Sequence, residues 1–269
     1  MPDHNPTLSA AARERFPRGL VQPASGFRFS VDALLLASFA RIKGARGLDL
    51  GCGCGVVGLG LLLRHPERGF TMHGLDLNPD MVAAARSNAA LLGFGERYTA
   101  ELADLGDLGD VTDPAVVPAE IGPALAPESF DLVVSNPPYR RPGQGRDCPD
   151  PGKSLGRFES GAGLPDFTRA AGRLLRNRGR AAFVFPAERL ADLLLALRES
   201  RLEPKIMRLV HSRAKEAARL VLVGAVKNAA PGLGVQAPLV LYGQGAASRE
   251  LSPEALAFCP FLGCNPVRE

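Results

Sequence analysis

The stretch GLDLGCGCGVVGLG, residues 47–60, constrains the fold more than any other part of the sequence. It opens on an apolar segment broken only by Asp49, continues with three glycines at alternate positions, and ends in an apolar segment. Glycine lets the backbone turn tightly and lets a ligand approach it closely. Strand, glycine loop and helix in this order are typical of nucleotide-binding α/β proteins. A plain tight turn under a helix would use the same small residues, so the glycines alone do not decide.

Strands and helices continue to alternate after this loop. Strands are predicted at 47–50, 70–77, 98–102, 130–135, 180–185, 204–210 and 220–226, and helices at 30–41, 56–64, 79–92, 164–176 and 187–199. Because five of the seven strands are interleaved with helices, we expect an α/β fold. The prediction is a Rossmann-like, seven-stranded, mostly parallel sheet with helices on both faces. The hydrophobic content of 46% is enough to fill the core of such a domain.

Several polar and glycine-rich segments come directly after predicted strands. They are Gly51–Gly55, Asp76, Asp104 and Asn136–Tyr139. In a parallel sheet, ligands bind beyond the carboxyl ends of the strands. We therefore expect these segments to lie along one edge of the sheet and to act together.

The glycine loop and the next strand predict a cofactor that contains adenosine. Gly53, Gly55 and Gly58 fit the dinucleotide fingerprint, and Asp76 lies 21 residues after Gly55, where an acid binds the ribose. Asp49 favours a different cofactor, because a carboxylate just before the loop gains nothing from an anionic pyrophosphate. S-adenosylmethionine carries an ammonium and a sulfonium group, and it suits Asp49 better.

Three acidic side chains then have roles toward S-adenosylmethionine. Asp49 holds a cationic group or orders the loop, and Asp76 accepts hydrogen bonds from the ribose. Asp104 accepts from the adenine amino group, although a solvated loop acid explains that residue nearly as well.

The sequence Asn136-Pro137-Pro138-Tyr139 ends a predicted core strand. An amino group on a base is a poor nucleophile, because its lone pair is delocalised into the ring. The side-chain carbonyl of Asn136 and the backbone carbonyl of Pro137 can accept its two hydrogens and orient the nitrogen. The prolines restrict the backbone and bring no N–H. Tyr139 offers a flat face on which an extruded base can stack. A simple strand stop is the competing interpretation.

These motifs carry a family resemblance. Asp49–Gly55, Asp76 and Asn136–Tyr139, in this order, resemble class I S-adenosylmethionine-dependent methyltransferases that act on amino nitrogens. Together with GFRFSVDALLLASFA, SNPPYRRPGQG and HSRAKEAARLVLVGAVKN, they resemble the tRNA1(Val) adenine-N6 methyltransferase family over roughly residues 26–228.

The resemblance implies a target and an organisation of the chain. The target is an adenine beside the anticodon, bound by Asn136–Tyr139, and the glycine loop with Asp76 and Asp104 binds the cofactor. An N-terminal segment, residues 1–43, packs over the cofactor and brings Asp32 and also Arg28 to it; plain helix capping explains Asp32 equally well. Residues 44–228 form the methyltransferase domain. Residues 229–269 have no recognised counterpart, and their role is unknown.

Basic residues follow the proposed target site directly. They are Arg140, Arg141, Arg146, Lys153 and Arg157. A second cluster comprises Arg169, Arg173, Arg176, Arg178 and Arg180. Charge runs are usually solvated faces, but the position beside the target site favours contacts with an RNA backbone, and tRNA is the expected partner. The sequence does not predict the oligomeric state.

Composition limits the other classes. Five cysteines without a signal sequence favour free thiols in a reducing compartment, so we expect a soluble cytoplasmic protein with no membrane span. Cys52 and Cys54 lie inside the glycine loop without a histidine at ligand spacing, so we expect no metal.

Other functions remain as alternatives. A protein glutamine methyltransferase shares the Asn-Pro-Pro-Tyr motif but carries a helical domain in front, and only some 26 residues precede the match here. A DNA methyltransferase needs a target-recognition domain, for which no insertion is large enough. A dinucleotide oxidoreductase leaves Asp49 and the motif unexplained. A non-catalytic binding module that keeps the cofactor fold is the alternative outside the enzymes.

Overall fold

The computed structural model describes residues 6–23, 28–105, 125–139, 162–243 and 250–264. The helices are α1 (Pro6–Glu14), α2 (Val31–Phe39), α3 (Val56–Arg64), α4 (Pro79–Leu91), α7 (Leu164–Leu174), α8 (Leu190–Glu199) and α9 (Pro253–Phe258), with short 3-10 helices η2 (Ala187–Arg189) and η3 (Pro260–Cys264). The strands are β1 (Arg46–Leu50), β2 (Thr71–Asp76), β3 (Tyr98–Leu102), β4 (Phe130–Ser135), β5 (Leu175–Pro186), β6 (Leu202–His211), β7 (Ala218–Lys227), β8 (Gly234–Val235) and β9 (Leu239–Val240).

The strands form one mixed sheet in the order β3-β2-β1-β4-β5-β7-β6-β8, with β9 also paired to β6. The pairs among β3, β2, β1, β4 and β5 are parallel, and β7 is antiparallel to both of its neighbours. The α/β class and the mostly parallel sheet are confirmed. The number of strands was wrong, because the described residues form nine strands and not seven. The two extra strands have two residues each, too few to show any alternation of apolar and polar side chains.

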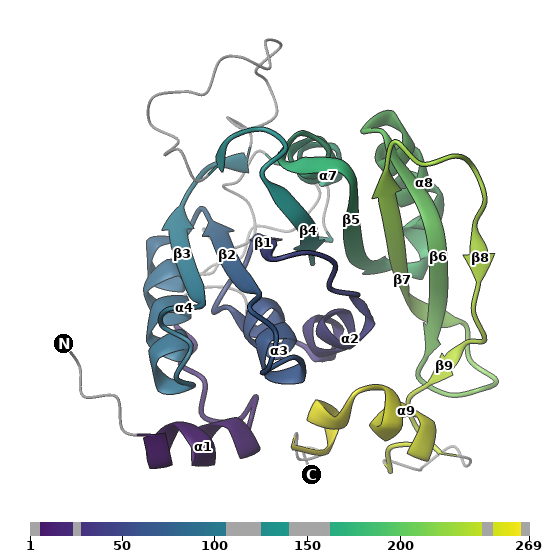
Figure 1. Ribbon diagram of the computed structural model, residues 1–269. Coiled ribbons are helices and arrows are strands. Elements are labelled where there is room, and N and C mark those ends of the chain that lie inside the picture. The colour runs from purple at the N-terminus through teal and green to yellow at the C-terminus, as the bar shows by residue number, and fades with distance from the viewer. Residues whose placement is uncertain (1–5, 24–27, 106–124, 140–161, 244–249, 265–269) are drawn as a thin grey trace, which may run out of the picture.

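Helices cover both faces of the sheet. Figure 1 shows α2, α3 and α4 on one face and α7 and α8 on the other. Each face buries its own apolar cluster, one around Leu59 and Leu62 of α3 and the other around Leu174 of α7 and Leu197 of α8. Buried strands such as Phe130–Ser135 are enclosed along their whole length, which explains why this strand is mostly apolar.

The start of β5 differs from the prediction. We predicted a helix to Arg176 and a strand from Arg180, but α7 ends at Leu174 and the strand begins at Leu175. Arg178 has a φ of 62°, and the register with β4 shifts between Phe130 and Leu132. Because of this irregularity and the run of charged residues, the first residues of the strand show no alternation of apolar and polar side chains, and the sequence pattern did not identify them.

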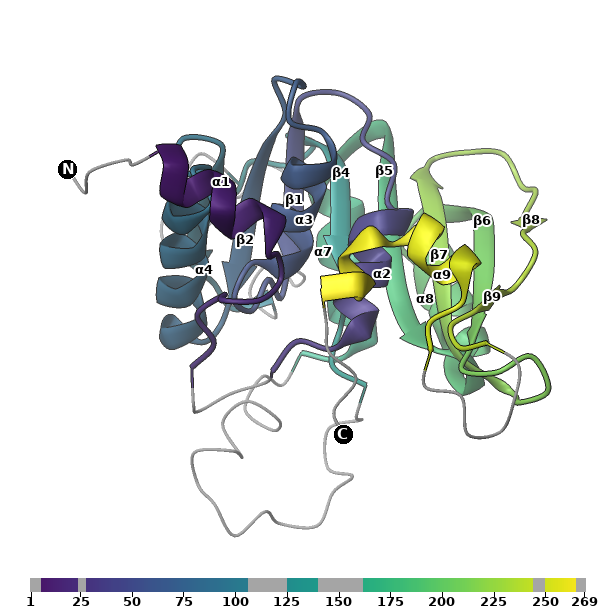
Figure 2. The ribbon, with the colours of Figure 1, turned by 90° about the horizontal axis from the view of Figure 1, so that it is seen from below.

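The N-terminal segment and the C-terminal tail pack on the same face. Figures 1 and 2 show α1 beside α4, and α9 beside α2. The amide of Asn88 on α4 bonds the backbone of Val21 at 2.7 and 3.0 Å and the carbonyl of Cys54 at 2.9 Å. Residues before β1 are thereby tied to the glycine loop. The tail adds β8 and β9 to the sheet edge, and the thiol of Cys259 lies 3.4 Å from the carbonyl of Leu34 on α2.

Among the described helices, none has the length and apolar character that a membrane crossing requires.

Candidate active site

The glycine loop joins β1 to α3 at the carboxyl edge of the sheet. Gly53 has a φ of 53° and Gly55 a φ of 84°, a region that favours glycine. A Cβ atom on Gly55 would lie 3.0 Å from the hydroxyl of Tyr98, whereas no heavy atom lies within 4 Å of the corresponding point on Gly53. The loop is therefore packed from below at Gly55 and open at Gly53, where a ligand can approach the backbone.

Asp76 at the end of β2 supports this loop. Its carboxylate accepts hydrogen bonds from the backbone N–H of Gly53 at 2.8 Å and of Asn78 at 2.9 Å. The side chain is half-buried, and burial raises its pKa although these bonds oppose the shift. A carboxylate has about four acceptor sites. Asp76 therefore keeps acceptor capacity for a ribose diol.

Asp49 is a deeply buried acid. It is 1% exposed and accepts one hydrogen bond, from the backbone N–H of Gly58 at 3.1 Å. No described Lys, Arg or His forms an ion pair with it. Burial, and to a smaller extent the charge of Asp76, raise the pKa of Asp49 to about 7. A cationic ligand group near the loop would favour its charged form, which fits S-adenosylmethionine and not an anionic pyrophosphate.

The predicted segments after the strands lie at one edge. The hydroxyl of Ser135 at the end of β4 donates to the carbonyl of Leu50 at 2.8 Å. The N–H of Ala103 after β3 donates to the carbonyl of Asp76 at 3.0 Å, which sets the half-buried Asp104 beside the end of β2. The parallel register of β1 with its neighbours brings these ends together.

The segment Asn136–Tyr139 forms a corner that contacts α2. The hydroxyl of Tyr139 lies 2.6 Å from a carboxylate oxygen of Asp32 and 2.9 Å from the side-chain oxygen of Asn136. A tyrosine hydroxyl has one hydrogen, and the nearer, charged oxygen of Asp32 is its stronger acceptor. Asn136 is half-buried, and its oxygen remains available to another donor. Burial, reinforced by the charge of Asp32, raises the pKa of Tyr139 and keeps the phenol protonated.

Further residues hold the ring and backbone of Tyr139. The ring meets Phe185 edge to face, with 5.7 Å between centroids, and Arg189 donates to the carbonyl of Tyr139 at 2.8 Å. Sequence reasoning missed Phe185, near the end of β5, and Arg189, which ends η2 just before α8. Their position at and just after the carboxyl end of a parallel strand was the signal that could have identified them. Pro137, which follows Asn136, is buried. No described residue donates a hydrogen bond to its carbonyl.

Asp32 lies in the first turn of α2. Ser30 occupies the N-cap position with extended backbone but makes no side-chain capping bond. The structure brings Asp32 to Tyr139, and so to the predicted target side of the site. Arg28 is exposed.

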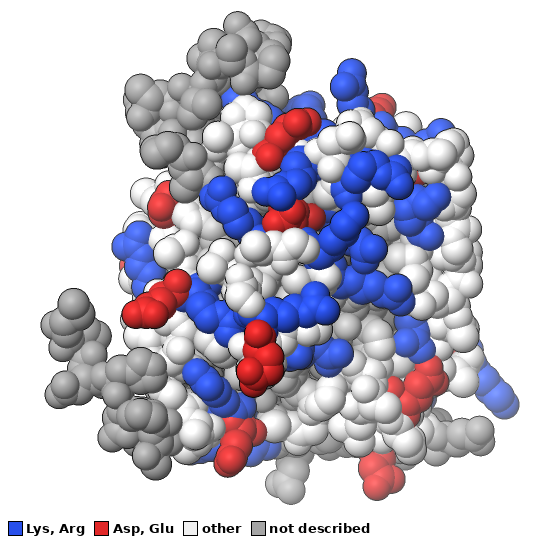
Figure 3. Space-filling model, in the orientation of Figure 1, with Lys and Arg blue, Asp and Glu red and all other residues white. Residues whose placement is uncertain are grey.

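The basic clusters have different outcomes. The first, Arg140, Arg141, Arg146, Lys153 and Arg157, lies outside the described residues. The sequence order suggested that the second cluster, Arg169, Arg173, Arg176, Arg178 and Arg180, lies beside the target site. Part of it does not. Arg176 pairs with Asp131 at 2.8 Å, and Arg180 lies opposite Leu132, so both lie toward the start of β4, whereas Asn136 follows its end. On the face of the molecule that is turned to the viewer, Figure 3 shows Lys and Arg side chains gathered over β5, β6 and β7.

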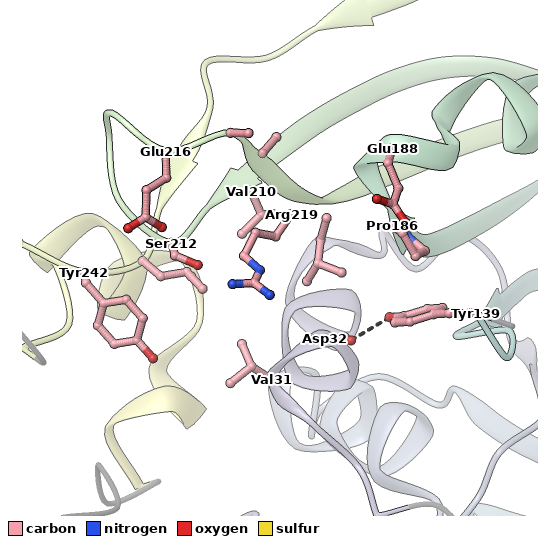
Figure 4. A pocket seen from close by; sticks show the side chains of 14 residues that line it. Val31, Asp32, Tyr139, Pro186, Glu188, Val210, Ser212, Glu216, Arg219 and Tyr242 are labelled. Carbon is pink, nitrogen blue, oxygen red and sulfur yellow. Dashed lines mark hydrogen bonds between the residues drawn. The ribbon is translucent and has the colours of Figure 1, made fainter. Parts of the chain in front are cut away.

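A pocket of about 710 Å³ adjoins the corner (Figure 4). It is lined by Val31, Asp32, Tyr139, Pro186, Glu188, Val210, Ser212, Glu216, Ala217, Ala218, Arg219, Leu220, Leu241 and Tyr242, and we call it the hairpin pocket because the β6–β7 hairpin forms one wall. None of the residues of the glycine loop lines it.

Comparisons with known proteins agree with this architecture. The family described as "Methyltransferase domain" matches residues 42–220. A tRNA1(Val) (adenine(37)-N6)-methyltransferase of Aeromonas hydrophila is 31% identical over 197 residues, which cover 72% of this chain and 75% of that protein. One with the same name from Porphyromonas gingivalis is 29% identical over 200 residues, covering 72% of this chain and 70% of that protein.

A solved structure shares the fold. A predicted O-methyltransferase from Agrobacterium tumefaciens superposes with a TM-score of 0.65 over 86% of this chain and 96% of that chain, at 23% identity. Since the identity is low, this likeness shows the fold alone.

Proposed function

Because the chain belongs to the methyltransferase-domain family and is similar to tRNA1(Val) (adenine(37)-N6)-methyltransferases, we propose that it methylates the N6 amino group of an adenine in tRNA. The family assignment makes it a methyltransferase with S-adenosylmethionine as cofactor. The corner formed by Asn136 and Tyr139 carries the proposal for the target. Asp32 takes up the hydroxyl hydrogen of Tyr139 and leaves the oxygen of Asn136 free to accept from an amino group.

The cofactor site in this proposal is the carboxyl edge around the glycine loop. Gly51, Gly53 and Gly55 let the cofactor approach the backbone, and Gly53 has open space above it. The carboxylate of Asp49 balances the positive charge of the cofactor, and that of Asp76 accepts hydrogen bonds from its ribose. Asp104 accepts from the adenine amino group, and Asp32 borders the site from α2. Bound S-adenosylmethionine supplies a methyl group on a sulfonium, which is a good leaving group.

The target amino group lies between two acceptors. The side-chain oxygen of Asn136 and the carbonyl of Pro137 bind its two hydrogens, so that the nitrogen lone pair points toward the cofactor. This removes the need for a strong base, because the positioning of the nitrogen for in-line attack supplies most of the catalysis. Pro138 restricts the backbone next to this acceptor.

Tyr139 is the stacking face for the extruded base. Its hydroxyl is held by Asp32, its carbonyl by Arg189, and its ring by Phe185. A residue whose hydroxyl, ring and backbone are already fixed loses little side-chain freedom when a base binds. Stacking of about 1–3 kcal/mol is therefore retained as affinity.

The RNA backbone supplies further affinity in this proposal. Arg140, Arg141, Arg146, Lys153 and Arg157 follow the corner directly in sequence. A single extruded base offers little contact area, and phosphate contacts by cations usually dominate binding to nucleic acids.

Transfer of label from tritiated S-adenosylmethionine tests the class of substrate. The purified protein is incubated with bulk tRNA that lacks the modification, and separately with a protein extract from which nucleic acids are removed. We expect label in tRNA, and we expect Asn136→Ala to abolish it while Asn177→Ala, at the other edge of the sheet, keeps it. Label confined to protein glutamine would favour the glutamine methyltransferase, and label in neither fraction would favour a non-catalytic module.

A further inference from the structure

We propose that the hairpin pocket binds the nucleotide next to the methylated adenosine in the RNA strand, with Arg219 on its phosphate and Tyr242 against its base. This deepens the proposed function and rests on it. The pocket shares two residues with the corner described above, Asp32 and Tyr139. A nucleotide that leaves the Tyr139 site along the RNA strand therefore has an adjoining space to enter.

The volume and the lining suit a nucleotide. Pockets for small ligands range over about 300–1,000 Å³, and this one measures about 710 Å³. Apolar side chains such as Val31, Val210 and Leu241 alternate with charged ones along its walls. A base needs apolar contact on its faces and polar contact at its edge, and the mixture provides both.

Arg219 points into the space of the pocket. It is the second residue of β7, its side chain is exposed, and Figure 4 shows its guanidinium in the middle of the pocket. Within the described part of the chain it makes no hydrogen bond or ion pair, although many other arginines do. A guanidinium left free inside a pocket is suited to bidentate binding of a phosphate.

The carboxylates around Arg219 are largely engaged elsewhere. Asp32 accepts from Tyr139, and Glu216 pairs with Arg213 at 3.2 Å. Glu188 lies on the wall opposite Tyr242 in Figure 4 and can accept from the amino group of a base. Among the described residues that line the pocket, Arg219 therefore offers a free cation for a phosphate and Glu188 an acceptor for a base edge.

Tyr242 is held in place as a stacking surface. Its N–H donates to the carbonyl of Ser212 at 3.0 Å, and it forms a bridge with Leu251. The guanidinium of Arg213 lies 5.7 Å from the centre of its ring. The tail thus contributes an aromatic wall to a space beside the proposed target site, which gives residues after 229 a role in substrate binding.

The test uses full-length tRNA joined from two pieces, so that one nucleotide beside the target adenosine can be changed. Single-turnover rates at subsaturating enzyme are measured for wild type, Arg219→Gln and Tyr242→Leu. Lys215→Gln is the matched control, because Lys215 is exposed on the same hairpin but does not line the pocket. Affinity for S-adenosylmethionine is measured in parallel, and we expect it to be unchanged in all variants.

We expect Tyr242→Leu to lower the rate about tenfold or more on intact tRNA, from the loss of stacking. On tRNA with an abasic residue on one side of the target, the same variant should differ little from wild type. Arg219→Gln should behave likewise toward a neutral methylphosphonate at one flanking phosphate. Variants that match Lys215→Gln on intact tRNA, or that lose the same factor on intact and altered tRNA, would overturn the pocket assignment. A wild type that methylates no tRNA would instead overturn the proposed function.

Discussion

Replacing Asp49 with Asn should stabilise the protein relative to wild type progressively more as pH rises, and should at the same time weaken cofactor binding. Asp49 is buried and its pKa is raised from 3.8 to about 7, mainly by desolvation. Between these two values the folded protein holds a proton that the unfolded chain has released. The stability of the wild type must therefore fall as pH rises through this window and level off above about pH 7. Asn has the same shape, can still accept from Gly58, and does not titrate.

The size of the effect follows from the two pKa values. Each pH unit inside the window is worth about 1.4 kcal/mol. Integrated from pH 5 to pH 8, the free energy of unfolding of the Asn variant should rise relative to wild type by about 2.5 kcal/mol. A difference between two pH values removes any constant cost of the unpaired amide hydrogens of Asn, which is about 1–3 kcal/mol.

Urea unfolding followed by circular dichroism at pH 5, 6, 7 and 8 measures this difference. Glu67→Gln is the control, because it removes one negative charge from an exposed site. Calorimetry at pH 8 should show S-adenosylmethionine bound at least about tenfold more weakly by Asp49→Asn, the loss expected for a charged interaction. A stability difference that does not change with pH would refute the raised pKa. Unchanged affinity would refute the role of Asp49 toward a cationic cofactor.

Other predictions concern single contacts of the site. Asp76→Ala should weaken S-adenosylmethionine binding by about 1.5–3 kcal/mol, because a charged acceptor for the ribose is lost; calorimetry measures it, and unchanged affinity or tight NAD binding would contradict the assignment. Tyr139→Phe frees Asp32 and should lower kcat on tRNA severalfold with cofactor affinity intact, since the ring remains but loses its anchor; an unchanged kcat would show that the anchor is unimportant. Neutralising Arg140 and Arg141 together should flatten the log–log salt dependence of tRNA binding by roughly one to two units, at about 0.7–0.9 for each lost phosphate contact; a wild-type slope would remove these residues from the RNA interface.

The sequence predicted the elements that bear the site because their signals are local. The strand Phe130–Ser135 is apolar apart from Asp131 and Ser135 and is soon followed by two prolines, and its predicted limits agree with the structure. The helix Val56–Arg64 follows a glycine loop and is apolar up to its last residue, and it too has the predicted limits. Parallel order then places the strand ends together, so the carboxyl edge was predictable from topology alone.

Contacts between distant segments were not predictable in this way. Asp32 and Tyr139 are separated by 107 positions, and the sequence around Asp32 is equally typical of an ordinary helix start. The helix and strands of the C-terminal tail were not predicted, for a different reason. Its strands have two residues each, and α9 has six, which is too short for a helical period to stand out. No sequence motif therefore predicts that Tyr242 lines the hairpin pocket.

Nucleoside mass spectrometry of treated tRNA tests the central claim most directly. Unmodified tRNA is incubated with S-adenosylmethionine and either wild type or Asn136→Ala, digested to nucleosides, and mapped by fragments of the intact strand. The account predicts N6-methyladenosine at an adenine in a single-stranded loop, because pairing in a duplex hides that amino group, and it predicts loss of the product with Asn136→Ala at unchanged cofactor affinity. Methylation of another atom or base, or N6-methyladenosine made equally well by Asn136→Ala, would contradict it.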